Sequence, residues 1–195
     1  MDTDNKTRCK WCLKDPLYIK YHDEEWGVPI YNDEKIFEIL LLETFQAGLS
    51  WITILRKREN FRKAFDNFNY KIISNYSNKK LKELQLDPGI VRNKLKINAA
   101  KTNAISFLNV QKEFETFSNY IWGFTNRKQI KNNFNAHNKL PEKTKLSDKI
   151  SNDLKKRGFK FVGSTIIYAQ MQAMGIVNDH TLDCFRHKEI FISNI

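Results

Sequence analysis

Apolar residues recur at intervals of three and four along most of this chain, whereas the strict alternation typical of half-buried strands is weak. The sequence also shows no internal repeat. This spacing predicts an all-α fold.

The clearest helix signal begins at Asn32 or Asp33, either of which can cap a helix that ends near Gly48. The positions that share one face of this helix are Ile36, Leu40, Glu43 and Ala47. Because its neighbours on that face are apolar, we expect Glu43 to point into the protein rather than into water.

A second helix is predicted to begin at Ser50. One of its faces carries Trp51, Ile54, Leu55, Phe61 and Phe65. Its cations lie largely elsewhere and are Arg56, Lys57, Arg58, Arg62 and Lys63. Such a basic face is an ordinary solvated surface unless other parts of the chain also indicate DNA binding.

Two further helices flank a tight turn of sequence Leu-Asp-Pro-Gly-Ile at residues 86–90. The first is predicted to begin at Ser77 or Asn78 and to run through Leu84, and the second spans about residues 91–108. The turn would present backbone N–H groups near a helix N-terminus, which suits a DNA phosphate.

The candidate phosphate-binding residues at this turn are Gly89, Arg92 and Lys94, with Lys96 nearby. Residues 126–145 are predicted to form a long, irregular connection whose function the sequence does not indicate. Beyond it we expect one helix over residues 147–157 and another over 165–174, the second capped by Ser164.

The composition permits one buried core or two small lobes, since 41% of the 195 residues are hydrophobic. The 33 Lys and Arg against 22 Asp and Glu give a net charge of +11, which favours nucleic acid or an anionic membrane surface as partner. The first eight residues lack the apolar segment of a signal peptide, and no apolar stretch approaches the roughly 18 residues of a membrane span. We therefore expect a cytoplasmic protein with no membrane partner.

Aromatic residues gather in the first quarter of the chain around one carboxylate. They are Trp11, Tyr18, Tyr21, Trp26 and Trp51, and the carboxylate is that of Glu43. Aromatic faces and a buried anion suit a flat, electron-poor cation. The alternative is that these side chains simply fill the core.

Cys9, Cys12 and Cys184 cannot form a closed set of disulfides, so metal binding or free thiols is expected. His180 and Cys184, four residues apart, would point the same way on a helical turn, and Cys9 with His22 would complete a tetrahedral zinc site. A second set replaces His22 with Cys12, and a third possibility is a buried histidine and thiols without metal.

Five ordered segments resemble one known family, the type I 3-methyladenine DNA glycosylases (the Tag family), over residues 8–184. They are DPLYIKYHDEEWG at 15–27, QAGLSW at 46–51, KRE at 57–59, KRGFKFVG at 156–163 and GIVNDH at 175–180. The resemblance implies an all-α fold of the helix-hairpin-helix glycosylase superfamily.

The resemblance also implies a structural zinc ion, one per chain, that joins the N- and C-terminal segments. Its ligands would be Cys9, His22, His180 and Cys184, which leaves Cys12 out. The base pocket would lie at Glu43, Trp51, Tyr21 and Trp26, and extend to Trp11 and Tyr18.

The implied activity is hydrolysis of the N-glycosidic bond of 3-methyladenine in alkylated double-stranded DNA, which leaves an abasic site. The carboxylate of Glu43 would recognise the base, stabilise the transition state or activate water. Leu49 would fill the gap left by the extruded base or form a core contact. The chain departs from the family pattern at Thr44 and Phe45, and it lacks the Gly/Pro-Asp element that many relatives in the superfamily carry after the hairpin.

We expect one catalytic unit over residues 1–195, acting as a monomer. One lobe would span about residues 33–125, and the other 8–32 together with 145–184. The tail at 185–195 lies outside the resemblance. The rival functions are a catalytically silent DNA-binding module of the same fold and an aromatic-cage protein that binds small organic cations.

Overall fold

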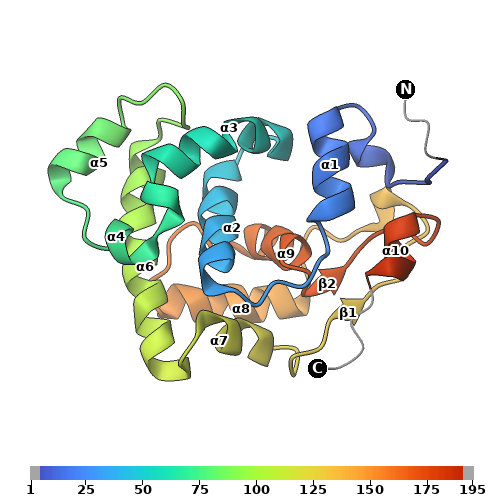
Figure 1. Cartoon of the computed structure of the whole chain (residues 1–195). Helices are drawn as coiled ribbons and strands as arrows, with labels where there is room; N and C mark the ends of the chain where they lie inside the picture. Colours follow the sequence, from blue (N-terminus) through green and yellow to red (C-terminus); the bar gives the residue numbers. More distant parts are fainter. Residues whose placement is uncertain (1–4, 191–195) are drawn as a thin grey trace.

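The computed structural model describes residues 5–190 and is mainly helical, which confirms the expected fold class (Figure 1). Its elements are η1 (Lys10–Cys12), α1 (Pro16–Glu24), α2 (Asp33–Gln46), α3 (Trp51–Ala64), η2 (Asp66–Phe68), α4 (Tyr70–Ile73), α5 (Asn78–Leu84), α6 (Lys94–Phe114), α7 (Phe117–Gly123), β1 (Ile130–Lys131), η3 (His137–Lys139), α8 (Lys145–Lys156), α9 (Ser164–Ala173), β2 (Val177–Asn178) and α10 (Phe185–Glu189). The η elements are single 3₁₀ turns.

Helices α2, α5 and α6 begin at residues whose side chains cap them. The Asn32 side chain accepts a hydrogen bond from the Lys35 N–H at 2.9 Å, and Ser77 caps α5 in the same way. The helix expected at about 91–108 begins later, because Asn93 accepts from the amides of Leu95 and Lys96. It also continues beyond residue 108 to Phe114.

The predicted bounds of the last long helices need correction. Helix α8 begins before residue 147, because Thr144 is its N-cap and forms a capping box with Ser147. Helix α9 contains Ser164, and its N-cap is Gly163.

The connection at residues 126–145 is irregular, as expected, but it is tied firmly to the C-terminal part of the chain. Strands β1 and β2 form a parallel pair with Ile130 opposite Val177, so the fold is not wholly without strands. The Asn132 side chain donates to Asp179 at 2.6 Å. Gln129 donates to the carbonyls of Gly27 and Gly175.

Helix α2 passes through the middle of the molecule, next to α3 and α9 (Figure 1). Every residue from Ile36 to Phe45 is buried, including Glu38 and Glu43. Glu38 is paired with Arg58 at 2.6 Å and Arg62 at 3.0 Å, whereas Glu43 has no such partner among the described residues. The apolar core extends over segments of both predicted lobes, and their division stays a prediction.

The segment that precedes η1 lies beside the start of α10, so parts of the chain near its two ends are in contact (Figure 1). The Phe185 N–H donates to the Thr7 carbonyl at 2.9 Å. Of the predicted tail, residues 185–189 form α10, and 191–195 lie outside the described residues. Within the part that the structure describes, no helix is both long enough and apolar enough to cross a membrane.

Candidate functional site

A cavity of about 170 Å³ lies between α1, α2, α3 and α9. Its lining residues are Trp11, Tyr18, Tyr21, Trp26, Glu43, Gln46, Trp51, His137, Ala169 and Gln172. The structure therefore brings together all the aromatic residues predicted for the pocket, and Glu43 with them.

The aromatic rings pack against one another around this cavity. The ring centroids of Trp11 lie 4.7 Å from Tyr18 and 5.1 Å from Trp26, both with edge-to-face geometry. On another wall, the centroids of Tyr21 and Trp51 are 5.6 Å apart. Since each ring is held by its neighbours, the walls of the pocket are formed before any ligand enters.

Glu43 is 3% exposed, and burial raises the pKa of its carboxyl to about 8. Its Oε2 atom and the indole nitrogens of Trp11 and Trp51 are buried and find no hydrogen-bond partner among the described residues. An unpartnered buried polar group costs about 1–3 kcal/mol, so such atoms are uncommon unless they serve a ligand. Here a hydrogen-bond acceptor and two donors line one cavity.

Sequence reasoning missed three polar residues of the pocket: Gln46, Gln172 and His137. His137 comes from the connection at residues 126–145, whose function the sequence does not indicate. It lies in η3, and the nearby Leu140 packs against the aromatic cluster. Burial lowers the pKa of the His137 imidazole. A single histidine in a polar segment carries no signal for this position, whereas Gln46 lies within a segment of the family resemblance.

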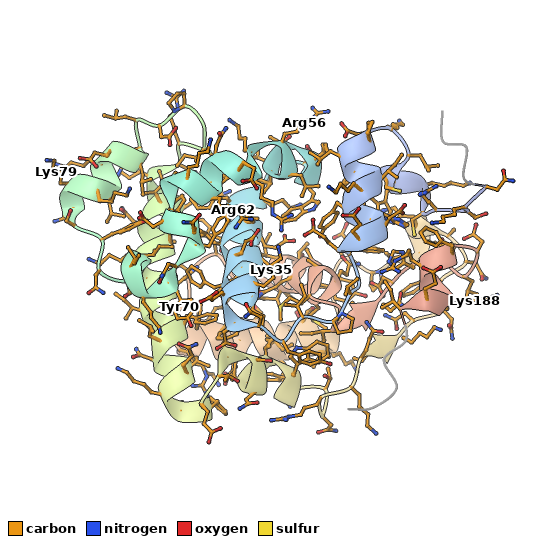
Figure 2. The ribbon with its side chains drawn as sticks, viewed as in Figure 1. Lys35, Arg56, Arg62, Tyr70, Lys79 and Lys188 are labelled. Atoms are coloured by element: carbon orange, nitrogen blue, oxygen red, sulfur yellow. The ribbon has the colours of Figure 1, made fainter. Side chains whose placement is uncertain are left out.

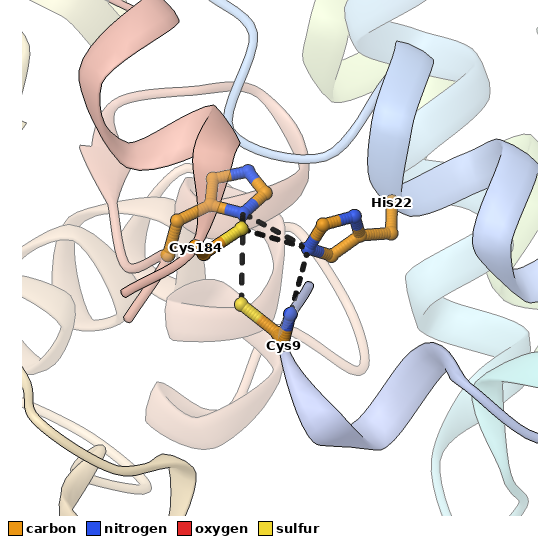
Figure 3. A group of neighbouring side chains, drawn as sticks. Cys9, His22 and Cys184 are labelled. Carbon is orange, nitrogen blue, oxygen red and sulfur yellow. Dashed lines mark hydrogen bonds between the residues drawn. The ribbon is translucent and has the colours of Figure 1, made fainter. Parts of the chain in front are cut away.

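Cys9, His22, His180 and Cys184 are all buried and form one cluster (Figure 3). The Cys184 Sγ atom lies 3.4 Å from both His22 Nε2 and His180 Nδ1. Cys9 Sγ is 3.6 Å from His180 Nδ1, and the two histidine nitrogens are 3.1 Å apart.

These donors fit a tetrahedral zinc ion, in which adjacent sulfur and nitrogen ligands lie about 3.3–3.8 Å apart. In metal sites, the histidine nitrogen that does not bind the metal usually donates a hydrogen bond to an oxygen, and both histidines do so here. His22 Nδ1 donates to Asp23 at 2.7 Å, and His180 Nε2 donates to the Trp26 carbonyl at 3.0 Å. Each imidazole therefore turns its other nitrogen toward the cluster.

The Cys12 sulfur lies outside this group of donors and bonds to the Cys9 carbonyl at 3.1 Å. Of the two candidate ligand sets, the geometry favours the one with His22. The contact between the thiols lowers the pKa of Cys184, helped by both histidines, and raises that of Cys9. A thiolate is thus available without further rearrangement.

One expectation for this cluster is wrong. His180 and Cys184 do not share a helical turn, because the backbone between them forms a tight turn in which the Cys184 N–H donates to the Thr181 carbonyl at 2.8 Å. Cys184 is instead the N-cap residue of α10.

The predicted DNA-binding residues lie on the turn between α2 and α3 and on the loop between α5 and α6, up to the first residue of α6. Leu49 is 40% exposed between α2 and α3, directly after Gly48, whose φ of +82° favours glycine. Arg92 and Lys94 are exposed at the start of α6. Arg56 and Lys79 add exposed cations on α3 and α5 (Figure 2).

Two details of the predicted phosphate site need correction. The Gly89 N–H already donates to the Asp87 carboxylate at 2.7 Å, and the Gly89 carbonyl accepts from Lys57 at 3.2 Å. Lys96 is 6% exposed and bonds to backbone carbonyls of residues 45 and 47. Gly89 therefore shapes the turn, since a side chain there would press on Asn60, and Lys96 is not free for phosphate.

The chain matches a family model described as methyladenine glycosylase over residues 11–187. It is 45% identical to DNA-3-methyladenine glycosylase 1 of Escherichia coli (strain K12) over 177 residues, which is 91% of this chain and 95% of that protein. DNA-3-methyladenine glycosylase of Haemophilus influenzae (strain ATCC 51907 / DSM 11121 / KW20 / Rd) is 44% identical over 178 residues, 91% of this chain and 96% of the relative.

The fold is also that of a variant of 3-methyladenine DNA glycosylase I solved in complex with 3-methyladenine. That structure superposes with a TM-score of 0.89 at 31% identity and covers 91% of this chain and 96% of that one. Fold and pocket thus place the chain in the class of helical DNA glycosylases. Within that class, the chain belongs to the methyladenine glycosylase family.

Proposed function

We propose that this protein removes 3-methyladenine from alkylated DNA by hydrolysis of the N-glycosidic bond, leaving an abasic site. The observation that carries this proposal is that one cavity is lined by Glu43, with a buried carboxyl oxygen that has no hydrogen-bond partner, and by Trp11 and Trp51, whose buried indole N–H groups have none either. The names of the relatives, and the bound base in one of the related structures, support the same substrate.

The pocket suits a methylated purine that carries positive charge in DNA. Aromatic faces attract such a cation more strongly than they attract neutral adenine, and the Glu43 carboxylate accepts hydrogen bonds from its edge. A neutral base would not favour the ionised form of Glu43, so this charge attraction would be absent. Weakened pairing of the damaged base also lowers the cost of extruding it from the duplex.

Glu43 is proposed to act on the base rather than on the attacking water. Because its pKa lies near 8, the carboxyl carries a proton at neutral pH while the pocket is empty. Entry of a cationic base favours the ionised form, so binding would release that proton. The cationic base is already a good leaving group, and binding with charge stabilisation would supply most of the acceleration.

Zinc is the metal proposed for Cys9, His22, His180 and Cys184. Thiolate and imidazole ligands suit zinc, and four protein donors leave no position open for water or substrate. The ion would therefore contribute stability, by cross-linking segments from the two ends of the chain, and take no part in hydrolysis.

Double-stranded DNA is the proposed partner, bound by a monomer in the cytoplasm. Arg92 and Lys94 would contact phosphates, and the exposed Leu49 would occupy the gap left by the extruded base. The net charge of +11 adds attraction that is independent of sequence.

The test is to incubate the purified protein with methylated duplex DNA and to measure both free 3-methyladenine and abasic sites. We expect both products in equal amounts. Tight binding to DNA without release of base would instead identify a silent DNA-binding module. Binding of small organic cations without affinity for abasic DNA would identify an aromatic-cage protein.

A further inference from the structure

The ammonium group of Lys96 lies buried where α6 meets the end of α2. Its Nζ atom donates to the carbonyl of Phe45 at 2.9 Å and to that of Ala47 at 2.6 Å. The side chain is 6% exposed. Lys96 thus spans about fifty residues of sequence to bind backbone atoms rather than another side chain.

Helix α2 needs a donor at this position. The last carbonyl groups of a helix lack partners within it, and the C-terminal end of the helix dipole favours a cation. The last turn of α2 contains no basic residue of its own. Lys96 supplies both the hydrogen bonds and the charge from a neighbouring helix.

The segment that Lys96 holds connects two walls of the base pocket. Glu43 lies just before it and Trp51 just after it, and Gln46 within it also lines the cavity. The same segment presents the exposed Leu49, whose N–H donates to the Gln46 carbonyl at 2.6 Å. Since Gly48 has open space around its Cα, contacts from Gly48 contribute little to the position of the turn.

The other end of this connection is the proposed phosphate site. Lys96 lies in the first turn of α6, where Asn93 accepts hydrogen bonds from the backbone amides of Leu95 and Lys96. Arg92 and Lys94 are exposed beside it. The first turn of α6, which Asn93 caps, therefore connects the candidate phosphate-binding residues to the buried ammonium group of Lys96.

We propose that Lys96 is a positioning residue that couples DNA binding at the start of α6 to the placement of Leu49 in the duplex. This inference rests on the proposed function. Lys96 would act through the backbone of residues 45–47 and not through its charge on the pocket, because burial alone accounts for the raised pKa of Glu43.

The chain offers a matched control for testing this role. Lys101 lies on the same helix and also donates to a backbone carbonyl, that of Tyr76, at 2.6 Å. Lys96→Met and Lys101→Met each remove the donor and keep an apolar stem. Only the first removes a bond to the turn that carries Leu49.

The experiment measures release of 3-methyladenine from methylated DNA with enzyme in excess, and affinity for undamaged duplex. A third reading is the fluorescence of 2-aminopurine beside an abasic-site analogue, where insertion of Leu49 alters base stacking. Leu49→Ala gives the fluorescence expected when no leucine side chain is inserted into the duplex. Thermal melts show whether the lysine variants are folded to the same extent.

For Lys96→Met we expect a rate about tenfold to a hundredfold below wild type, the loss expected when reacting groups are displaced slightly. Its affinity for undamaged DNA should be unchanged, and its fluorescence should match Leu49→Ala. Lys101→Met should retain the wild-type rate and signal. If Lys96→Met does not fold, Lys96→Gln, which keeps N–H donors on a shorter, uncharged side chain, should give the same pattern with a smaller loss.

Wild-type rate and fluorescence in the Lys96 variants would overturn the inference and leave the proposed function intact. Equal losses in the Lys96 and Lys101 variants would also overturn it, because they would indicate general destabilisation of α6. A wild-type protein that releases no base would overturn the proposed function, and this inference with it.

Discussion

Glu43 combines three properties that rarely occur together in one carboxyl group. It is buried, it lacks a positive partner among the described residues, and one of its oxygens is left without a hydrogen bond. Glu38, one and a half turns earlier on the same helix, is equally buried but is paired with Arg58 and Arg62. Glu38 is thus neutralised within the fold, whereas Glu43 is not.

The raised pKa of Glu43 predicts how stability depends on pH. Its carboxyl titrates near 8 in the folded protein and near 4.5 when unfolded, so the stability of wild type relative to Glu43→Gln is highest below 4.5 and falls as pH rises toward 8. Above pH 8 the variant should be the more stable by about 3–5 kcal/mol. Urea unfolding of both proteins across this range measures the difference. Parallel profiles would show that Glu43 is not desolvated.

Residue by residue, sequence reasoning found the pocket but not all of it. Helical spacing predicted that Glu43 points into the protein, and the family resemblance predicted that the aromatic residues surround it. His137 escaped because its place depends on β1, η3 and Leu140, none of which has a strong local signal. Lys96 was grouped with the candidate phosphate-binding residues because its actual partners are backbone carbonyls, which no sequence pattern displays.

At the scale of elements, most of the helices were predicted, whereas α4 and α7 were not. Of the two caps that the sequence offered at each start, the first is the N-cap in both cases, Asn32 for α2 and Ser77 for α5. The four residues of α4 are too few for a periodic pattern to develop, and the seven of α7, although capped by Thr116, follow directly on the long helix α6. The turn between His180 and Cys184 brings both side chains into the Cys/His cluster, and spacing alone does not reveal it.

The loop between α5 and α6 carries the prediction for DNA affinity. If Arg92 contacts one phosphate, Arg92→Gln should weaken binding to all duplexes alike and reduce the slope of log affinity against log salt by about one unit. Salt titrations with undamaged duplexes of different sequence measure this slope. Lys155→Gln, which alters an exposed cation on the distant α8, is the control. An unchanged slope for Arg92→Gln would remove this residue from the interface.

At the scale of the whole molecule, the Cys/His cluster joins segments that are distant in sequence. Cys9 and His22 come from one end of the chain, and His180 and Cys184 come from the other. Asp23, which accepts the hydrogen bond from His22, is paired with Arg8 at 2.8 Å. The cluster also supports the pocket, because the ring centroids of His180 and Trp26 lie 4.6 Å apart. Loss of the metal should therefore loosen one aromatic wall.

Elemental analysis of the purified protein should find about one zinc ion per chain. Cys12→Ser should retain it, since the Cys12 sulfur bonds to a carbonyl, and Cys184→Ser should lose it. A chelator should lower the melting temperature of wild type and of Cys12→Ser, but should have no further effect on Cys184→Ser. Loss of zinc from Cys12→Ser would instead select the other ligand set.

The central claim is that the buried carboxylate of Glu43 recognises the cationic base and that this recognition drives excision. The most direct measurement is the single-turnover release of 3-methyladenine from methylated duplex by wild type and by Glu43→Gln, alongside affinity for undamaged DNA. We predict that the variant binds undamaged DNA normally and loses about 1.5–3 kcal/mol of transition-state stabilisation, the contribution of a charged hydrogen bond. Release of the base at the full wild-type rate would show that Glu43 is only a tolerated residue of the core.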